Sequence, residues 1–526
     1  MKKPLLITLM TVFDGQRLIA LCTSRFGAPL CCLILGAISS LGLAPYNLWP
    51  VTLLSLVLLM MLLVCSKSLK ALFFASMCYF GAFNTVSLWW LNFVIEGFGQ
   101  IPAPFSWLWV SLCGLILALH HSLLALIAKA LSRGSRVAFL LFLLPAAFTA
   151  ADATVSLGPL GFPWMNFGNL ALTGPFKAYL PLIGARGASL MFCLAAGSAA
   201  LAALRQYPYL PVAGVIVAFG LVFSSTRYTT DGSDIRAYLV QGNVPQEVRW
   251  DPNLASQSLA TYWDLSKPLL SEGSLVIWPE GALPFYLTDS VQLMNDLQSA
   301  FSDAKASLIL GSLRRAPDGR HNSMIRLGAG VTDKPLFYDK RKLVPLGEFV
   351  PFATLLRPLG RMFNIPMSDF VPPEHDTSSI SANGVKFIPA ICYEAIFPET
   401  LMSNDSEDSG AILMISNDAW FGSTRGPLEH LAIARVRSME LQKPMLRATS
   451  NGITAVIGAD GTVMSALPRD QASVLDARVR TMKGQTPYSR FGNLALILIC
   501  LLLSAAGLAI SRLKHKEDPI EKLVRP

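Results

Sequence analysis

The sequence predicts a membrane domain of eight α-helices joined to a layered α+β domain outside the bilayer. Three observations support this prediction. Hydrophobic residues make up 52% of the 526-residue chain and charged residues only 15%, with a mean hydropathy of +0.47. Soluble proteins carry about 25% charged residues. Long apolar runs fill the chain up to Ser224 and return once near the C-terminus, whereas the block between them alternates short apolar runs with helix-like segments.

Eight apolar runs are the candidate membrane spans. A spanning helix needs about 20 mostly apolar residues, because each residue adds about 1.5 Å and the hydrocarbon layer is about 30 Å thick. The fifth run is short and contains Pro145, which spanning helices tolerate. The eight runs are Phe26–Ala44, Leu48–Cys65, Leu72–Ile95, Trp107–Ala128, Val137–Ala151, Gly187–Leu204, Tyr209–Ser224 and Leu494–Ile510.

Basic residues predict the orientation of these spans. The loops Pro45–Trp49 and Glu96–Ser106 contain no Lys or Arg, whereas the alternate loops and the C-terminal tail are basic. Because positive residues stay on the cytoplasmic side, both termini are expected inside the cell. Lys177 and Arg186 lie on the outer side as exceptions. The same distribution explains the net charge of +9 without nucleic-acid binding.

The N-terminal stretch Met1–Arg17 has no small-residue cleavage site, so no removable signal peptide is expected. We therefore expect a membrane domain at 1–226, an outer domain at 227–489, and the eighth span with a cytoplasmic tail at 490–526. Strands alternating with helices in the outer block indicate an α/β or layered α+β core. The expected strands are Ile235–Val240, Leu275–Trp278, Ser307–Leu310, Phe387–Ile391, Ile412–Ser416, Met445–Thr449 and Thr454–Ile457, and the expected helices are Asn253–Leu270, Ser290–Lys305 and Glu429–Leu441.

Cys392 is the one cysteine of nine in the outer block, at the end of the apolar run Phe387–Ile391. A lone thiol there has no disulfide partner in its own domain. A small buried apolar residue is the ordinary explanation for such a cysteine. The functional interpretation is a nucleophile that a strand end holds rigidly.

A nucleophilic thiol needs a base and a cation or other donor near the developing oxyanion. Glu280 follows the apolar run Leu275–Trp278, and the segment Phe337–Pro351 carries Lys340 and Glu348. Each group alone would more often be an ordinary surface charge. No metal-ligand spacing and no phosphate-binding loop accompanies them.

Together, Glu280, Lys340 and Cys392 in this order resemble the nitrilase superfamily, whose Glu–Lys–Cys triad lies on an αββα sandwich. With the predicted spans, the chain resembles the membrane-integrated apolipoprotein N-acyltransferase family in particular. The motifs that carry this resemblance are Val-Gln-Gly-Asn-Val-Pro-Gln (240–246), Trp-Pro-Glu-Gly-Ala (278–282), Tyr-Asp-Lys-Arg-Lys-Leu-Val-Pro-Leu-Gly-Glu-Phe-Val-Pro (338–351), Cys-Tyr-Glu (392–394), Ser-Asn-Asp-Ala-Trp-Phe-Gly (416–422), Arg-Ala-Thr-Ser-Asn-Gly (447–452) and Gly-Phe-Pro-Trp (161–164).

The resemblance implies a role for each matching residue. Glu280 would be the general base, Lys340 the residue that stabilises the transition state and Cys392 the nucleophile, with Glu348 orienting the first two. The residues expected to surround or support the site are Tyr393, Glu394, Trp250, Asn417 and Trp420, and those expected at a lipid entrance are Phe349, Phe352 and Trp164. The pair Glu429-His430 stands where the family pattern has Gln-His, on a helix expected to lie away from the thiol.

The reaction that the resemblance implies is a two-step acyl transfer without a cofactor. A fatty acyl chain would pass from the sn-1 position of a phospholipid to Cys392 and then to the α-amine of a diacylglyceryl-cysteine on an apolipoprotein. The expected protein is a monomer in the bacterial inner membrane, surrounded by membrane lipids, with its outer domain on the periplasmic side. The alternatives are a membrane-tethered amidase or nitrilase that hydrolyses a C–N bond, and a transporter or scaffold with a degenerate outer domain.

Two further features have open interpretations. His120 and His121 lie within the fourth span, where ionisable groups are functional candidates, but no acidic partner is evident and a structural role is expected. In the loop Gly158–Gly168, Trp164 and Phe167 suit either an anchor at the lipid headgroups or a substrate-facing role.

Overall fold

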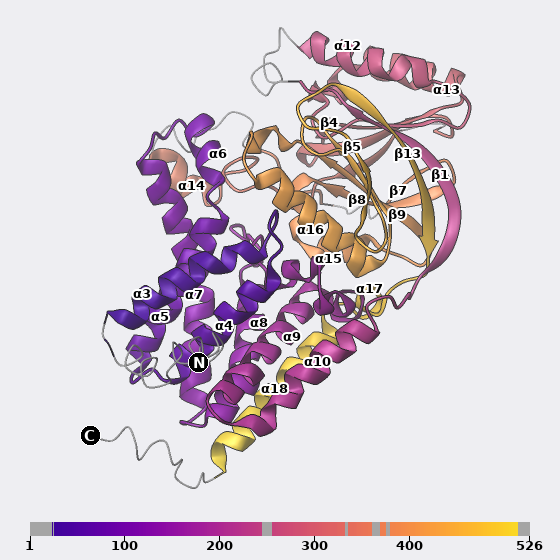
Figure 1. Ribbon diagram of the computed structural model, residues 1–526. Helices are drawn as coiled ribbons and strands as arrows, with labels where there is room; N and C mark the ends of the chain where they lie inside the picture. Colours follow the sequence, from indigo (N-terminus) through magenta and orange to yellow (C-terminus); the bar gives the residue numbers. More distant parts are fainter. Residues whose placement is uncertain are drawn as a thin grey trace, which may run out of the picture.

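The computed structural model describes residue 24 and residues 26–244, 255–331, 335–359, 369–374 and 379–513 of the chain. Its first part is a bundle of helices, and the last described helix returns to pack against that bundle (Figure 1). These helices are α3 (Gly27–Ser39), α4 (Trp49–Val64), α5 (Leu69–Ser87), α6 (Leu91–Gly97), α7 (Phe105–Leu131), α8 (Leu144–Thr154), α9 (Leu180–Ala203), α10 (Leu210–Val222) and α18 (Leu494–Arg512).

Every predicted span coincides with an apolar helix in the described part of the chain. Four helical segments there are long and apolar enough to cross a membrane by themselves, and they contain α5, α7, α9 and α18. The four others are shorter apolar helical segments, at Gly27–Gly42, Trp49–Val64, Ala138–Thr154 and Tyr207–Val222. The total of eight crossings therefore stays a prediction. The predicted span Leu72–Ile95 is wrong at its end, because α5 stops at Ser87 and the separate helix α6 begins at Leu91.

Ionisable side chains inside the bundle have partners that the sequence did not reveal. The expectation that the histidines of α7 have no acidic partner is wrong. His121 Nε2 lies 3.1 Å from Asp152 Oδ1 on α8, where both side chains are buried. Arg186, an exception to the charge pattern of the loops, is a buried residue of α9 that pairs with Glu399 of the outer domain. Its position is explained by this contact.

The outer domain contains two β-sheets packed face to face (Figure 1). The first sheet has the strand order β13-β1-β2-β4-β5-β6, with β3 beside β4, and the second has the order β12-β11-β10-β9-β8-β7. Strand bounds are β1 Thr230–Gln241, β2 Leu275–Ile277, β3 Leu283–Tyr286, β4 Ser307–Ala316, β5 Gly319–Gly328, β6 Leu336–Asp339, β7 Ile380–Ala382, β8 Val385–Ile391, β9 Ser409–Ser416, β10 Met445–Thr449, β11 Ala455–Ile457, β12 Val463–Ala466 and β13 Ser473–Lys483.

The sheets form the inner two layers of a helix–sheet–sheet–helix arrangement. Strand β4 shows why: Ile309 joins the core between the sheets, whereas Leu308 and Leu310 join the core beneath α12 (Ala255–Ser266) and α13 (Val291–Asp303). This alternation is the period of two expected for a strand buried on both faces. The second sheet is covered by α15 (Pro398–Asn404) and α16 (Gly426–Leu441). The predicted layered α+β fold is therefore confirmed.

All seven predicted strands are present, six of them with shifted ends and Met445–Thr449 with the predicted bounds, but β3, β5, β6, β7, β12 and β13 were not predicted. Strand β5 escaped because it buries polar side chains such as His321, Asn322 and Ser323. Strand β13 escaped because it is long and half-exposed, with Arg478 and Arg480 on it. Hydrophobic alternation does not reveal either pattern.

Helix α16 joins the outer domain to the bundle, and Figure 1 shows it lying between the sheets and the helices. Its residues Ala432, Val436 and Met439 are part of the apolar core of the bundle. The break in α9 at Gly184 (φ 71°) presents the Ala185 N–H, which donates to Glu440 Oε1 of α16 at 2.6 Å. A side chain at Gly184 would collide with the ring of Tyr488, on α17 (Pro487–Phe491).

Candidate active site

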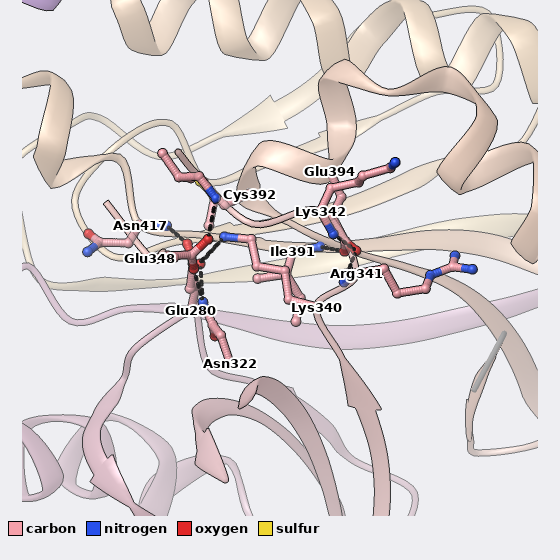
Figure 2. A network of polar contacts seen from close by, with 12 residues as sticks. Glu280, Asn322, Lys340, Arg341, Lys342, Glu348, Ile391, Cys392, Glu394 and Asn417 are labelled. Atoms are coloured by element: carbon pink, nitrogen blue, oxygen red, sulfur yellow. Dashed lines mark hydrogen bonds and ion pairs between the residues drawn. The ribbon is translucent and has the colours of Figure 1, made fainter. Parts of the chain in front are cut away.

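Glu280, Lys340 and Cys392 lie close together at the ends of three strands (Figure 2). Glu280 follows β2, Lys340 follows β6 and Cys392 follows β8. Strands β2 and β6 belong to the first sheet and β8 to the second. Residues more than a hundred positions apart are therefore brought together by the packing of the two sheets.

Lys340 is the centre of this cluster, and its side chain is almost fully buried. Its Nζ lies 3.0 Å from Glu280 Oε1 and 2.9 Å from Glu348 Oε1. Burial by itself would lower the pKa of Lys340, but the two carboxylates outweigh it and raise that pKa well above its usual range. Lys340 is therefore a permanent buried cation at neutral pH.

Asn322 is a site residue that the sequence did not single out. It lies on β5, and its Nδ2 donates to Glu280 Oε1 at 2.7 Å and to Glu348 Oε1 at 2.8 Å. The other oxygen of Glu280, Oε2, accepts the Asn417 N–H at 2.8 Å. Glu348 Oε2 accepts the Val344 N–H at 2.8 Å. Both carboxylates are thus held at both oxygens, so their orientation is fixed before any substrate arrives.

Cys392 has a left-handed backbone conformation, with φ 48°. Non-glycine residues rarely adopt this conformation, and those that do are often found at functional sites. Burial raises the pKa of the thiol above its usual range, the Glu280 carboxylate raises it further, and Lys340 partly opposes them. These electrostatic effects require both charges to lie near the thiol. The thiol is protonated at neutral pH and needs a base before it can attack.

Glu394 links the segment that carries Lys340 to the turn at Cys392 (the cysteine turn). Its carboxylate accepts the Tyr338 hydroxyl at 2.9 Å, the Arg341 N–H at 2.8 Å and the Ile391 N–H at 2.8 Å. The residues on either side of Lys340 and the residue before Cys392 are therefore fixed to one buried group. The neighbouring Tyr393 donates its hydroxyl to the Gly161 carbonyl at 2.8 Å, which links the site to the loop 158–168 of the membrane part.

The aromatic residues predicted at the entrance have different positions. Phe352 is 60% exposed and Phe349 is partly buried. Trp164 is only 3% exposed, and its Nε1 donates to Glu429 Oε2 at 2.8 Å. The interpretation of Trp164 as a headgroup anchor is therefore wrong, because the outer domain covers this side chain, whereas its role at a lipid entrance stays a prediction.

Of the other aromatic candidates, Phe167 is also no headgroup anchor, because it packs in the core of the bundle. Trp420, on the short helix η12 (Asp418–Phe421), is partly buried and its ring contacts Phe98 with centroids 4.5 Å apart. Trp250 lies outside the described residues.

The expected separation of Glu429-His430 from the thiol is wrong. His430 Nε2 lies 3.2 Å from the carbonyl oxygen of Cys392. The other ring nitrogen contacts Asp418 and Arg447. These two residues fall within motifs that carry the family resemblance, but an isolated motif does not reveal which of its members reach the nucleophile. Across the described residues, no group of three His, Cys, Asp or Glu side chains is placed to hold a metal ion.

Comparison with known proteins identifies the family. A CN-hydrolase superfamily protein of known structure from Xanthomonas campestris covers 51% of this chain and 97% of its own, at 18% identity and a TM-score of 0.35. The family model for carbon-nitrogen hydrolases matches residues 242–488, and that for the apolipoprotein N-acyltransferase N-terminal domain matches residues 35–198. Apolipoprotein N-acyltransferase from Shewanella oneidensis is 35% identical, over 90% of this chain and 94% of that protein. The protein of the same name from Vibrio vulnificus is 32% identical, over 92% of this chain and 97% of its own. The chain belongs to the apolipoprotein N-acyltransferase family.

Membership of this family agrees with both halves of the fold. The carbon-nitrogen hydrolase match contains Glu280, Lys340, Glu348 and Cys392, and the N-terminal match contains α4 to α8. The apolar helices and the apolipoprotein N-acyltransferase relatives together fit a protein of the inner membrane.

A pH effect on stability is expected from Glu429, which joins α16 to the membrane part. Its Oε2 accepts the indole N–H groups of Trp90 and Trp164, and its Oε1 lies 2.9 Å from Arg425 Nε. Burial outweighs these partners and raises the pKa of Glu429 from 4.5 to about 7. Between pH 4.5 and 7 the unfolded chain releases this proton while the folded protein retains it, so stability falls by up to about 3 kcal/mol over that interval.

Glu429→Gln removes this titration and keeps an oxygen for the two indoles. We expect the Gln variant to melt several degrees above the parent at pH 8 in detergent, with a smaller difference as the pH falls to 4.5. Glu429→Ala is the control, because it leaves both buried indole N–H groups without an acceptor and should destabilise at every pH. A difference between Gln and parent that does not change with pH would contradict the raised pKa.

Proposed function

We propose that this protein N-acylates apolipoproteins by carrying a fatty acyl chain on Cys392. The observation that supports this mechanism most directly is the contact of Lys340 with both Glu280 and Glu348 beside the cysteine turn. Family membership supplies the reaction, in which the acceptor is a lipoprotein and the surroundings are membrane lipids. The geometry supplies a role for each residue.

In the first step, Glu280 accepts the proton of the Cys392 thiol, and the thiolate attacks the sn-1 ester carbonyl of a phospholipid. The negative charge that develops on the carbonyl oxygen is stabilised by the ammonium group of Lys340. The tetrahedral intermediate then breaks its bond to the glycerol oxygen. Glu280 returns the proton to that oxygen, and a lysophospholipid leaves.

In the second step, the α-amine of a diacylglyceryl-cysteine attacks the thioester carbonyl. Glu280 accepts a proton from the attacking nitrogen, Lys340 again stabilises the oxyanion, and the carbon–sulfur bond breaks. The thiolate recovers its proton from Glu280. An amine attacks a thioester far more readily than an oxygen ester, which is the chemical advantage of using sulfur. Glu348 and Asn322 hold the lysine and the base in place throughout.

Two lipid substrates explain why the proposed active site is joined to membrane helices. The proposal divides the chain at 1–226, 227–489 and 490–526, with the middle part in the periplasm, both termini in the cytoplasm, and the protein acting as a monomer. Acyl chains would then reach the thiol from the bilayer without crossing water. The exposed ring of Phe352 and the partly buried Phe349, which follow Glu348 in the chain, support a lipid entrance beside the site.

The test is to incubate the purified protein in detergent with a phospholipid and a synthetic diacylated lipopeptide. We expect the lipopeptide to gain the mass of one acyl group, and lysophospholipid to appear in equal amount. A lipopeptide with a blocked α-amine is the control and should gain nothing. Free fatty acid without any acylated lipopeptide would contradict the transfer and would favour hydrolysis by the same three residues.

A further inference from the structure

A buried polar cluster lies behind Cys392, on strands β9 and β10, the short helix η12 and α16, and it has no role in the proposed mechanism. It consists of Ser416, Asp418, His430 and Arg447, and all four residues are buried to 1% exposure or less. Asp418 Oδ1 accepts the Ser416 hydroxyl at 2.8 Å, and Asp418 Oδ2 accepts Arg447 Nη2 at 2.8 Å. Buried polar groups of this kind are costly unless each one is satisfied.

His430 connects this cluster to the nucleophile. Its Nδ1 lies 3.2 Å from both Asp418 Oδ1 and Arg447 Nη2, and its Nε2 lies 3.2 Å from the carbonyl oxygen of Cys392. The opposite face of the cluster is closed by Trp164, whose ring stacks on the imidazole with centroids 5.7 Å apart. The imidazole is therefore fixed on three sides.

The chemistry of the partners decides where the proton of His430 lies. A carbonyl oxygen only accepts hydrogen bonds, so Nε2 must carry a hydrogen to interact favourably with Cys392. Nδ1 can accept from Arg447 in the neutral ring, or donate to Asp418 in the charged ring. Both arrangements leave Nε2–H donating to the same carbonyl oxygen.

That hydrogen bond orients the whole peptide group between Cys392 and Tyr393. The peptide group between Cys392 and Tyr393 is planar, and in a trans peptide the Tyr393 N–H points in the direction opposite to the Cys392 carbonyl. Tyr393 is at the start of the short helix η11 (Cys392–Ile396), where the first N–H groups have no partner within the helix. Fixing the carbonyl therefore also fixes the direction of the Tyr393 N–H next to Cys392.

The backbone of Cys392 makes this support necessary. A left-handed cysteine persists only where its surroundings hold it. Glu394 holds the peptide group between Ala390 and Ile391, one residue before Cys392, through the Ile391 N–H. His430 holds the peptide after it. The two contacts restrict the nucleophile from both sides.

We infer that His430, held by Asp418 and Arg447, is a positioning residue that sets the orientation of the Cys392–Tyr393 peptide for acyl transfer. This inference rests on the proposed function and deepens it. His430 touches neither substrate nor the reacting sulfur, so its removal should slow formation of the acyl-enzyme without weakening the binding of phospholipid.

Three substitutions separate this role from simple packing. His430→Leu removes both nitrogens. His430→Asn places an amide where Nδ1 is, within reach of Asp418 but not of the Cys392 carbonyl. His430→Gln extends the amide to the position of Nε2, where it can donate to that carbonyl. The assay is the single-turnover rate at which phospholipid acylates Cys392, followed by intact-protein mass at several lipid concentrations, with melting temperatures measured alongside.

We expect the Leu and Asn variants to be about 10 to 100 times slower than the parent, with an unchanged lipid concentration at half-saturation, and Gln to remain within about threefold. If the His430→Leu protein does not fold, the comparison of the His430→Gln and His430→Asn proteins decides the test. A Gln variant as slow as the Asn variant at equal melting temperature would overturn this inference and leave the proposed function standing. A Leu variant as fast as the parent would do the same. A parent that never acylates Cys392 would instead overturn the proposed function.

Discussion

Cys392→Ala should abolish the covalent acyl adduct that the parent accumulates when it is given phospholipid without an acceptor. The expected loss exceeds about a thousandfold, because a methyl group offers no nucleophile and the oxyanion donors have nothing to stabilise. The adduct should be a thioester, so neutral hydroxylamine should release it. Intact-protein mass spectrometry before and after hydroxylamine measures both properties.

The other cysteines provide the matched control. Cys500 lies on α18, is partly buried, and is a free thiol like Cys392. Cys500→Ala should therefore keep the full adduct and its sensitivity to hydroxylamine. An acyl adduct on the Cys392→Ala protein would remove this residue from the mechanism, whatever the geometry around it.

The second large effect is expected from Lys340→Met. This substitution removes the cation between Glu280 and Glu348 and leaves a buried and a partly buried carboxylate that share the donor Asn322. Loss of the oxyanion partner should lower the acylation rate by about 10² to 10³. Breaking a buried ion pair from one side should also cost about 3–5 kcal/mol of stability.

A double variant separates these two consequences. Lys340→Met with Glu348→Gln restores the original net charge of the three groups, because one cation and one anion are lost together. We expect the double variant to recover much of the melting temperature while its acylation rate stays as low as that of the single variant. Recovery of the rate together with the melting temperature would show that Lys340 acts only by holding the site together.

The strand-end residues could be predicted because their signals are local. A short apolar run followed by a charged or nucleophilic residue is visible in the sequence, as for Glu280 and Cys392. Lys340 was found through the segment Phe337–Pro351 that carries it, although the strand β6 before it was not predicted. The packing of the two sheets then determines that these ends meet, and a known family pattern was needed to expect it.

The supporting residues could not be predicted because their roles depend on contacts between elements that lie far apart in the sequence. Asn322 is one polar residue among several on β5, and only the position of β6 beside that strand brings it to both carboxylates. His430 was assigned to the wrong surroundings because a helix in the sequence does not show which face meets the cysteine turn. Trp164 looked like a headgroup anchor because aromatic residues near spans usually are, yet the outer domain covers it.

Helix α16 makes the outer domain dependent on its contact with the helical bundle. The same helix lies beneath the nucleophile through His430, contributes Val436 and Met439 to the apolar core of the bundle, and accepts the Ala185 N–H through Glu440. Expressed alone, the nitrilase-like part would expose this apolar strip and a buried carboxylate to water. The outer domain therefore needs the bundle as a partner, and separating the two is expected to loosen the helix that positions Cys392.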